Sequence, residues 1–92
     1  MDIYAQLVVK IVEQQESVIG PVAIERAQTV KGLLIDWPAK NVVISESPMT
    51  VIDNLVNQYK VLFGQISVEV CKEAVGRLSQ RLSPEQIPAS LR

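Results

Sequence analysis

Apolar side chains recur at intervals of three and four along residues 2–19, which is the spacing of one face of an α-helix. They are Ile3, Tyr4, Leu7, Val8, Ile11 and Val12. Since successive residues lie about 100° apart, this stripe covers about half of the helix circumference, more than a single core contact requires. We therefore expect either that the helix is packed between other elements of its own fold or that part of the stripe meets another chain.

A second helix is predicted directly after the first. Gly20-Pro21 indicates the end of the first helix and the start of a second one that runs to about Thr29. Ser17 is a rival N-cap for a helix that begins at Val18, so the boundary between the two helices stays open at this point.

The third and fourth helices are predicted from their serine caps. Ser47 precedes Pro48 and begins a helix that stops at Gly64. The apolar face of this helix consists of Ile52, Leu55, Val56, Tyr59, Leu62 and Phe63, and Val61 lies off it. Ser67 is expected to cap a fourth helix, with Ile66 before it and Cys71 after it as a hydrophobic staple. The apolar stripe of this helix consists of Val68, Cys71, Val75, Leu78 and Leu82. For residues 84–92 we expect one short turn and a loose C-terminal tail, because a second proline soon interrupts the helical pattern.

Between the second and third helices the pattern changes to short β-branched and aromatic runs, at residues 33–37 and 42–44. Pro38 pre-sets φ for a type I turn, and Asn41 tolerates a positive φ at the turn exit. We therefore predict a β-hairpin. Two strands alone are marginal in water, so the hairpin must pack on the helices or extend a sheet with another chain.

These elements predict an α+β fold that is mainly helical. Their order is helix, helix, β-hairpin, helix, helix, and the apolar stripes and one hairpin face share one core. Residues 1–83 are expected to form a single domain, followed by the tail at residues 84–92.

Composition and charge argue against several classes of function but do not identify a partner. Hydrophobic residues make up 48% of the chain and aromatic residues 4%, so the core must be mainly aliphatic. The net charge is −1 and there is no basic stripe, so we expect no nucleic-acid binding. One cysteine without histidine forms neither an internal disulfide nor a zinc site, which fits a cytoplasmic protein without a cofactor. No eighteen apolar residues run together, so we expect no membrane partner.

No residue pattern indicates catalysis, and we expect a protein that is not an enzyme. Histidine, the usual general acid or base, is absent. Glu69 and Glu73 share a helix face, but Lys72 and Arg77 surround them, which favours ordinary surface ion pairs. Cys71 is either an activated thiolate near a helix N-terminus or, as its place on the apolar stripe favours, a buried core residue.

Several residues at the edge of the expected core, or outside it, are candidates for a protein interface. Trp37, at the end of the hairpin, is either a lid over the core or an exposed anchor for a partner. Gly76 falls on the polar side of its helix, where it is either tolerated or permits the close approach of another backbone. The candidate interface residues are Val8, Val9, Val12, Trp37, Val61, Val70 and Gly76.

Two short motifs carry a family resemblance. The segment Val18-Ile19-Gly20-Pro21-Val22-Ala23 runs from an apolar helix end through Gly-Pro into a second amphipathic helix, and Leu62-Phe63-Gly64 forms another helix end. In these motifs the chain resembles small bacterial helical domains of uncharacterised function, which occur alone or attached to signalling proteins. The resemblance implies no catalytic residues.

The sequence favours one function and leaves a second open. The favoured function is a non-catalytic protein–protein interaction module, a homodimer or the partner of another protein, in a regulatory or scaffold role. The alternative is a small-molecule-sensing domain with a pocket for a small apolar ligand between the helices and the hairpin. A sensor gains thermal stability with its ligand, whereas a self-associating module gains it with its own concentration.

Overall fold

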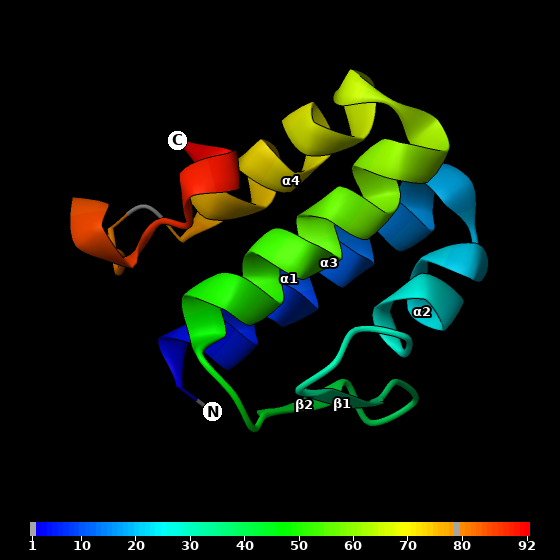
Figure 1. Ribbon diagram of the computed structural model, residues 1–92, viewed down its shortest axis with the longest axis horizontal. Coiled ribbons are helices and arrows are strands. Elements are labelled where there is room, and N and C mark those ends of the chain that lie inside the picture. The colour runs from blue at the N-terminus through cyan, green and yellow to red at the C-terminus, as the bar shows by residue number, and fades with distance from the viewer. Residues whose placement is uncertain (1, 79) are drawn as a thin grey trace.

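The computed structural model describes residues 2–78 and 80–92, and Figure 1 shows the order of their elements. The elements are α1 (Ile3–Ile19), α2 (Val22–Ala27), β1 (Leu33–Asp36), β2 (Asn41–Ile44), α3 (Pro48–Phe63), α4 (Gln65–Arg77) and two single 3₁₀ turns, η1 (Pro84–Gln86) and η2 (Ala89–Leu91). The predicted α+β class and the order helix, helix, hairpin, helix, helix are confirmed.

Helix α1 lies inside its own fold. It begins at Asp2, whose carboxylate accepts a hydrogen bond from the Ala5 N–H at 2.8 Å, and it ends at Gly20, where φ is 79°. Helices α2 and α4 and strand β2 all pack against it. The wide apolar stripe is therefore covered within the chain, which is the first of the two explanations that the sequence left open.

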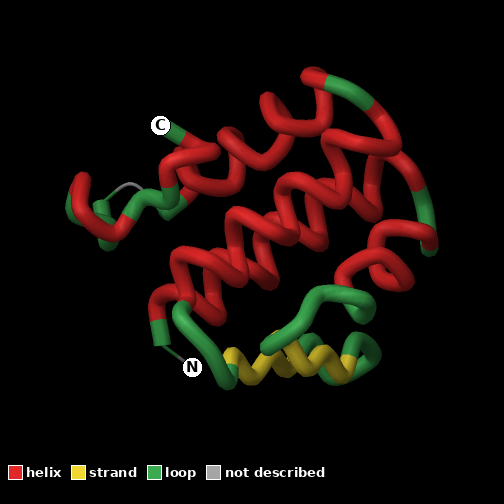
Figure 2. The backbone as a smooth tube through the Cα atoms, in the orientation of Figure 1, coloured by secondary structure: helices red, strands yellow, loops and turns green. Residues whose placement is uncertain are grey.

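The hairpin covers one side of the helices with one of its two faces (Figure 2). Its strands are antiparallel, and Leu33 and Val42 on the inner face are buried. On the outer face, Leu34 pairs directly with Val43, and both side chains are exposed. The residue with positive φ in the turn is Lys40, at 51°, and not Asn41 as expected, because Asn41 already belongs to β2.

Helices α3 and α4 meet at a sharp corner. Gly64, with φ at 80°, is both the C-cap of α3 and the N-cap of α4. The expectation that Ser67 caps the fourth helix is wrong, because α4 already begins at Gln65 and Ser67 is buried in its first turn. The regular helix also ends at Arg77, before the last two residues of the predicted apolar stripe.

The end of the C-terminal segment packs on the helices, whereas the turn η1 before it has no buried residue. The turn η2 contacts both α3 and α4, and Leu91 is buried. Ser90 donates hydrogen bonds from its N–H at 3.2 Å and from its hydroxyl at 2.5 Å to the Asp53 carboxylate of α3. These bonds and the burial of Leu91 outweigh the interruption by Pro88, which itself lies among the most buried side chains.

Candidate functional site

Three of the candidate interface residues are buried inside the chain. Val8 and Val12 have no exposed surface, because the wide stripe of α1 is covered within the fold. Trp37 is 9% exposed and acts as a lid. Its indole N–H donates to Glu16 at 3.2 Å, and the Lys40 ammonium lies 5.8 Å from its ring. The assignment of these three residues to an interface is therefore corrected.

The other four candidate residues differ in their solvent exposure. Val9 and Val70 are half-buried, and Val9 packs against the core. Val61 is 74% exposed. Gly76 is exposed, and no atom lies within 4 Å of the place that a Cβ would occupy.

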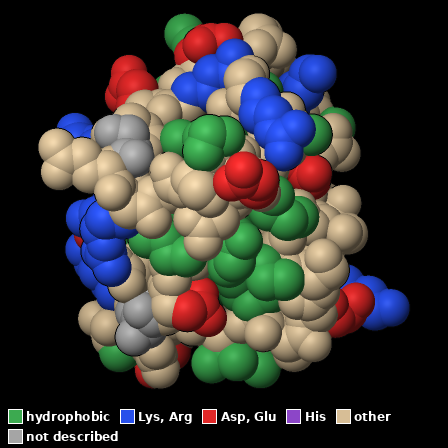
Figure 3. Space-filling model, turned by 90° about the vertical axis from the view of Figure 1, so that its left-hand side faces the viewer, with side chains coloured by type: hydrophobic (Ala, Val, Ile, Leu, Met, Phe, Trp, Pro, Cys, Tyr) green, Lys and Arg blue, Asp and Glu red, His purple; other side chains and the backbone are tan. Residues whose placement is uncertain are grey.

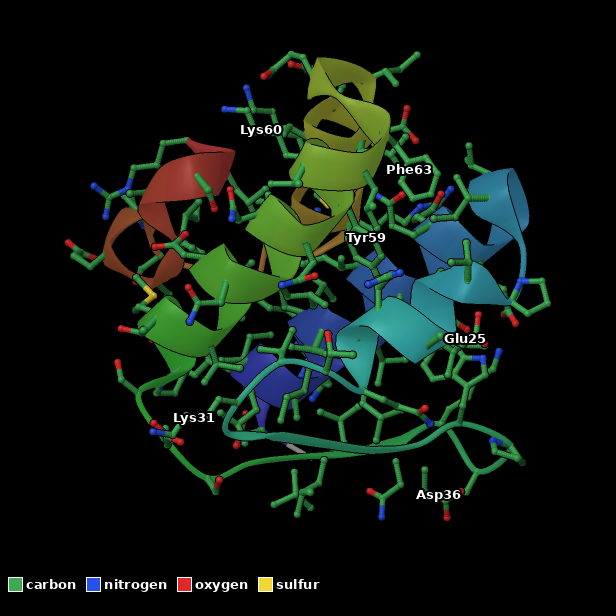
Figure 4. All side chains as sticks on the ribbon, turned by 45° about the vertical axis from the view of Figure 1, so that its right-hand side comes forward. Glu25, Lys31, Asp36, Tyr59, Lys60 and Phe63 are labelled. Carbon is green, nitrogen blue, oxygen red and sulfur yellow. The ribbon has the colours of Figure 1, made fainter. Side chains whose placement is uncertain are left out.

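The last turns of α1 and α3 and the first turn of α4 carry exposed apolar side chains. Gln15 near the end of α1 donates a hydrogen bond to the Ser67 carbonyl of α4 at 2.8 Å, which fixes these helix ends together. In Figure 4, Phe63 extends from the end of α3 toward the connection between α1 and α2. We call this group the apolar corner: Val18 (64% exposed), Val61 (74%), Leu62 (44%), Phe63 (38%) and Ile66 (73%).

Sequence reasoning found only Val61 of this group. Leu62 and Phe63 continue the apolar face of α3 by helical spacing and were expected in the core, but they lie in its last turn, beyond the cover of other elements. Ile66 was expected only as part of a cap, but α4 already begins at Gln65, and Ile66 lies exposed in its first turn. The signal that points to them is Gly64, which ends α3 immediately after Phe63.

Buried polar contacts link the four helices α1, α2, α3 and α4. The Gln15 amide N–H donates to the Ser67 carbonyl and, at 3.2 Å, to the Cys71 sulfur. The Tyr59 hydroxyl donates to the Ala23 carbonyl at 2.7 Å. Burial is the main cause that raises the pKa of Cys71 to about 11, against the smaller effect of the Gln15 hydrogen bond. The predicted core role of Cys71 is confirmed, and a thiol in this state is a poor nucleophile.

Some of the charged side chains form ordinary surface pairs. Glu69 lies 3.6 Å from Lys72 and accepts a hydrogen bond from Gln65 at 3.3 Å. Glu13 pairs with Lys40 at 2.7 Å and Lys10 at 3.5 Å. Within residues 2–78 and 80–92, no group of three potential ligands could hold a metal ion, and no helix is long and apolar enough to cross a membrane.

Two concavities lie away from the hairpin. One, of about 260 Å³, lies between α3, α4 and η2. The other, of about 480 Å³, is a more open surface beside η1, lined by Pro84, Glu85, Ile87 and Arg92. Figure 3 views the molecule from the left-hand side of Figure 1, the side on which the C-terminal segment lies, and shows apolar side chains flanked by charged ones. In the described part of the chain after Ile66, no large apolar side chain is strongly exposed.

Comparison of the chain with protein-family models, with curated proteins and with solved structures gives no match.

Proposed function

We propose that the chain is a non-catalytic protein–protein interaction module that forms a homodimer through the apolar corner. The observation that carries this proposal is the exposure of five large apolar side chains at one end of the helices. Their positions on α1, α3 and α4 belong to rigid helical elements, so the surface is formed before a partner arrives.

The size of the apolar corner suits a stable interface. Side chains of about 150 to 200 Å² each, exposed to the extents given above, leave about 500 Å² of apolar surface in water. A standard interface buries about 800 Å² per partner, of which somewhat more than half is apolar. The corner therefore supplies about the apolar area that one partner of such a complex needs.

The charges beside the corner favour a second copy as the occupant. Residues 61–66 carry no charged side chain, while Lys60 and Glu69 flank them with opposite charge. In a two-fold dimer the same surface is used twice, so Lys60 can lie opposite Glu69 of the partner subunit and like charges need not meet. A partner of strong net charge would gain little from this arrangement.

The outer face of the hairpin is the competing surface. It exposes the cross-strand pair Leu34 and Val43, but Asp36 and Asn41 share that face. Two apolar side chains cover less than half the area of the apolar corner, so we assign the dimer contact to the corner.

A pair of matched variants tests the proposal. Ile66→Ser removes an apolar side chain that is 73% exposed at the corner, and Leu34→Ser removes one that is 65% exposed on the hairpin. Size exclusion with light scattering should give twice the chain mass of 10.2 kDa at tens of micromolar. Ile66→Ser should weaken the dimer at least about tenfold, which is about 1.4 kcal/mol, whereas Leu34→Ser should leave it unchanged.

The controls separate association from folding. Both side chains are exposed, so thermal unfolding at low protein concentration should be similar in the two variants. A wild-type chain that keeps the monomer mass at hundreds of micromolar would refute the homodimer. A dimer that Leu34→Ser breaks and Ile66→Ser leaves intact would move the contact to the hairpin.

A further inference from the structure

The C-terminal segment, residues 84–92, is attached to helices α3 and α4 mainly through its last residues. The turn η1 has no buried residue, whereas η2 packs on both helices and its end lies against α4 in Figure 1. Pro88 and Leu91 are the buried side chains of this segment. We propose that residues 84–92 form a strap that opens as a unit while the four helices stay folded, and that its opening strengthens the homodimer. The second part of this proposal rests on the proposed function.

A single residue pair joins the strap to a helix by hydrogen bonds. Bonds such as the one from the Leu91 N–H to the Pro88 carbonyl, at 2.9 Å, lie inside the strap and do not attach it. Within the described chain, the hydrogen bonds from the strap to a helix both start at Ser90, whose N–H and hydroxyl donate to Asp53 Oδ1. This pair therefore acts as a latch. Without it, the strap is held by Pro88, Leu91 and the half-buried Ile87.

Few interactions oppose the opening of the strap. Ordering the backbone of residues 84–92 has a large entropic cost, which is offset only by the burial of two side chains, the partial burial of a third and the latch. Segments with few buried contacts open locally at a much lower free energy than global unfolding requires. The strap should therefore open far more often than the helices below it unfold.

Opening of the strap uncovers apolar surface on α3 and α4. Leu91 is 5% exposed where η2 packs on these two helices. Beside it lies the cleft of about 260 Å³, whose lining includes the apolar side chains of Val56 and Val68 and which Ser90 borders on one side. When the strap leaves, the surface under Leu91 is exposed and the cleft loses one of its walls.

The occupant of the uncovered surface is a second copy of the chain, because this surface is continuous with the apolar corner. Lys60 and Gln65 line the cleft, and they directly precede Val61 and Ile66 of the corner. A second copy that contacts the corner therefore borders the cleft and can bury more apolar area when the strap is open. A partner that binds the open state better shifts the strap toward opening, and by reciprocity an open strap tightens the dimer.

Amide hydrogen exchange of the full chain at low protein concentration tests the opening. Ser90→Asp places a carboxylate opposite Asp53, so the protection of the amides at positions 90 and 91 should fall at least about tenfold, and Ser90→Ala should lower it about threefold. Asp53→Asn, added to Ser90→Asp, supplies an amide donor for the new carboxylate and should restore the protection to within about threefold of the wild type. Unchanged protection in Ser90→Asp, or a parallel loss in the amides of α3, would overturn the strap.

Dissociation constants of the dimer, from a dilution series followed by light scattering, test the regulation. Ser90→Asp should dimerise about three- to tenfold more tightly than the wild type, and Ser90→Ala, which adds no charge, should change the constant in the same direction. Asp53→Asn with Ser90→Asp should return it to the wild-type value. Equal or weaker dimerisation of Ser90→Asp would overturn the link between strap and dimer. Since the exchange measurement needs no dimer, a monomeric wild-type chain with an opening strap would refute the homodimer and its regulation but not the strap.

Discussion

Replacing Gln15 by methionine should leave the stability of the fold unchanged or raise it. Gln15 has no exposed surface, and its amide N–H groups donate to the Ser67 carbonyl at 2.8 Å and to the Cys71 sulfur at 3.2 Å. Its Oε1 atom is buried and has no hydrogen-bond partner among the described residues. The side chain thus combines two favourable hydrogen bonds with one unpaired acceptor.

The balance of these contributions can be worked out. The two lost hydrogen bonds contribute about 0.5 to 1.5 kcal/mol each, and the bond to sulfur lies at the lower end because sulfur is a weak acceptor. Removing an unpaired buried acceptor returns about 1 to 3 kcal/mol. Ser67 keeps a donor for its carbonyl, since the helix pattern supplies the N–H of Cys71. Methionine is unbranched and of similar length, so the net change should lie between about −1 and +2 kcal/mol, with its centre slightly on the stabilising side.

Urea unfolding, followed by far-UV circular dichroism at low protein concentration, measures this change. Gln15→Ala is the matched control, because it removes the same polar groups but leaves a cavity, and it should cost about 2 to 4 kcal/mol. The urea dependence should be the same in all three proteins. If Gln15→Met instead costs more than about 2 kcal/mol, the Oε1 atom holds a donor such as a buried water, and the reasoning fails.

Two further predictions follow from the thiol and from the best-formed ion pair. Because burial raises the pKa of Cys71 to about 11, a thiol reagent at pH 8 should label the native protein at least about 100-fold more slowly than the urea-unfolded protein; comparable rates would show that the site opens. The hydrogen bond from Lys40 is the main cause that lowers the pKa of Glu13 below its usual value of 4.5. This pair stabilises the fold above pH 4.5 and loses that effect as the pH falls through the folded-state pKa of Glu13. In Lys40→Gln the urea midpoint should therefore fall less steeply between pH 5 and pH 3 than in the wild type. An unchanged slope would contradict the assignment.

The sequence predicted the helices well because their apolar periodicity and their terminal residues agree. Gly20 and Gly64 end α1 and α3 with φ near 80°, a conformation that glycine adopts without steric cost. The start of α4 was predicted wrongly from Ser67, since a serine cap is a local preference. Tertiary packing places Ser67 against Gln15 and begins the helix at Gln65.

The candidate interface was predicted less well, because exposure depends on which elements cover a face. The periodicity of α1 showed an unusually wide stripe, but it could not show that α2, β2 and α4 pack against this helix and that Val8 and Val12 are buried. Val61 was identified because it lies off the main stripe of its helix. Leu62 and Phe63 lie on that stripe, and only the position of the chain reversal shows that they extend past the core.

The location of the apolar corner follows from how the chain reverses between α3 and α4. Gly64 alone joins two helices of 16 and 13 residues, so no loop residues fold back over their ends. The last turn of α3 and the first turn of α4 therefore stand beyond the neighbouring elements, with Val61 and Ile66 the most exposed of their side chains. A longer polar loop would cover this surface at small entropic cost, because loop closure depends only weakly on length. Because the residues on both sides of Gly64 are apolar, they form an apolar surface that does not pack against the core. Substitutions there should change association while the free energy of unfolding of the monomer stays nearly constant.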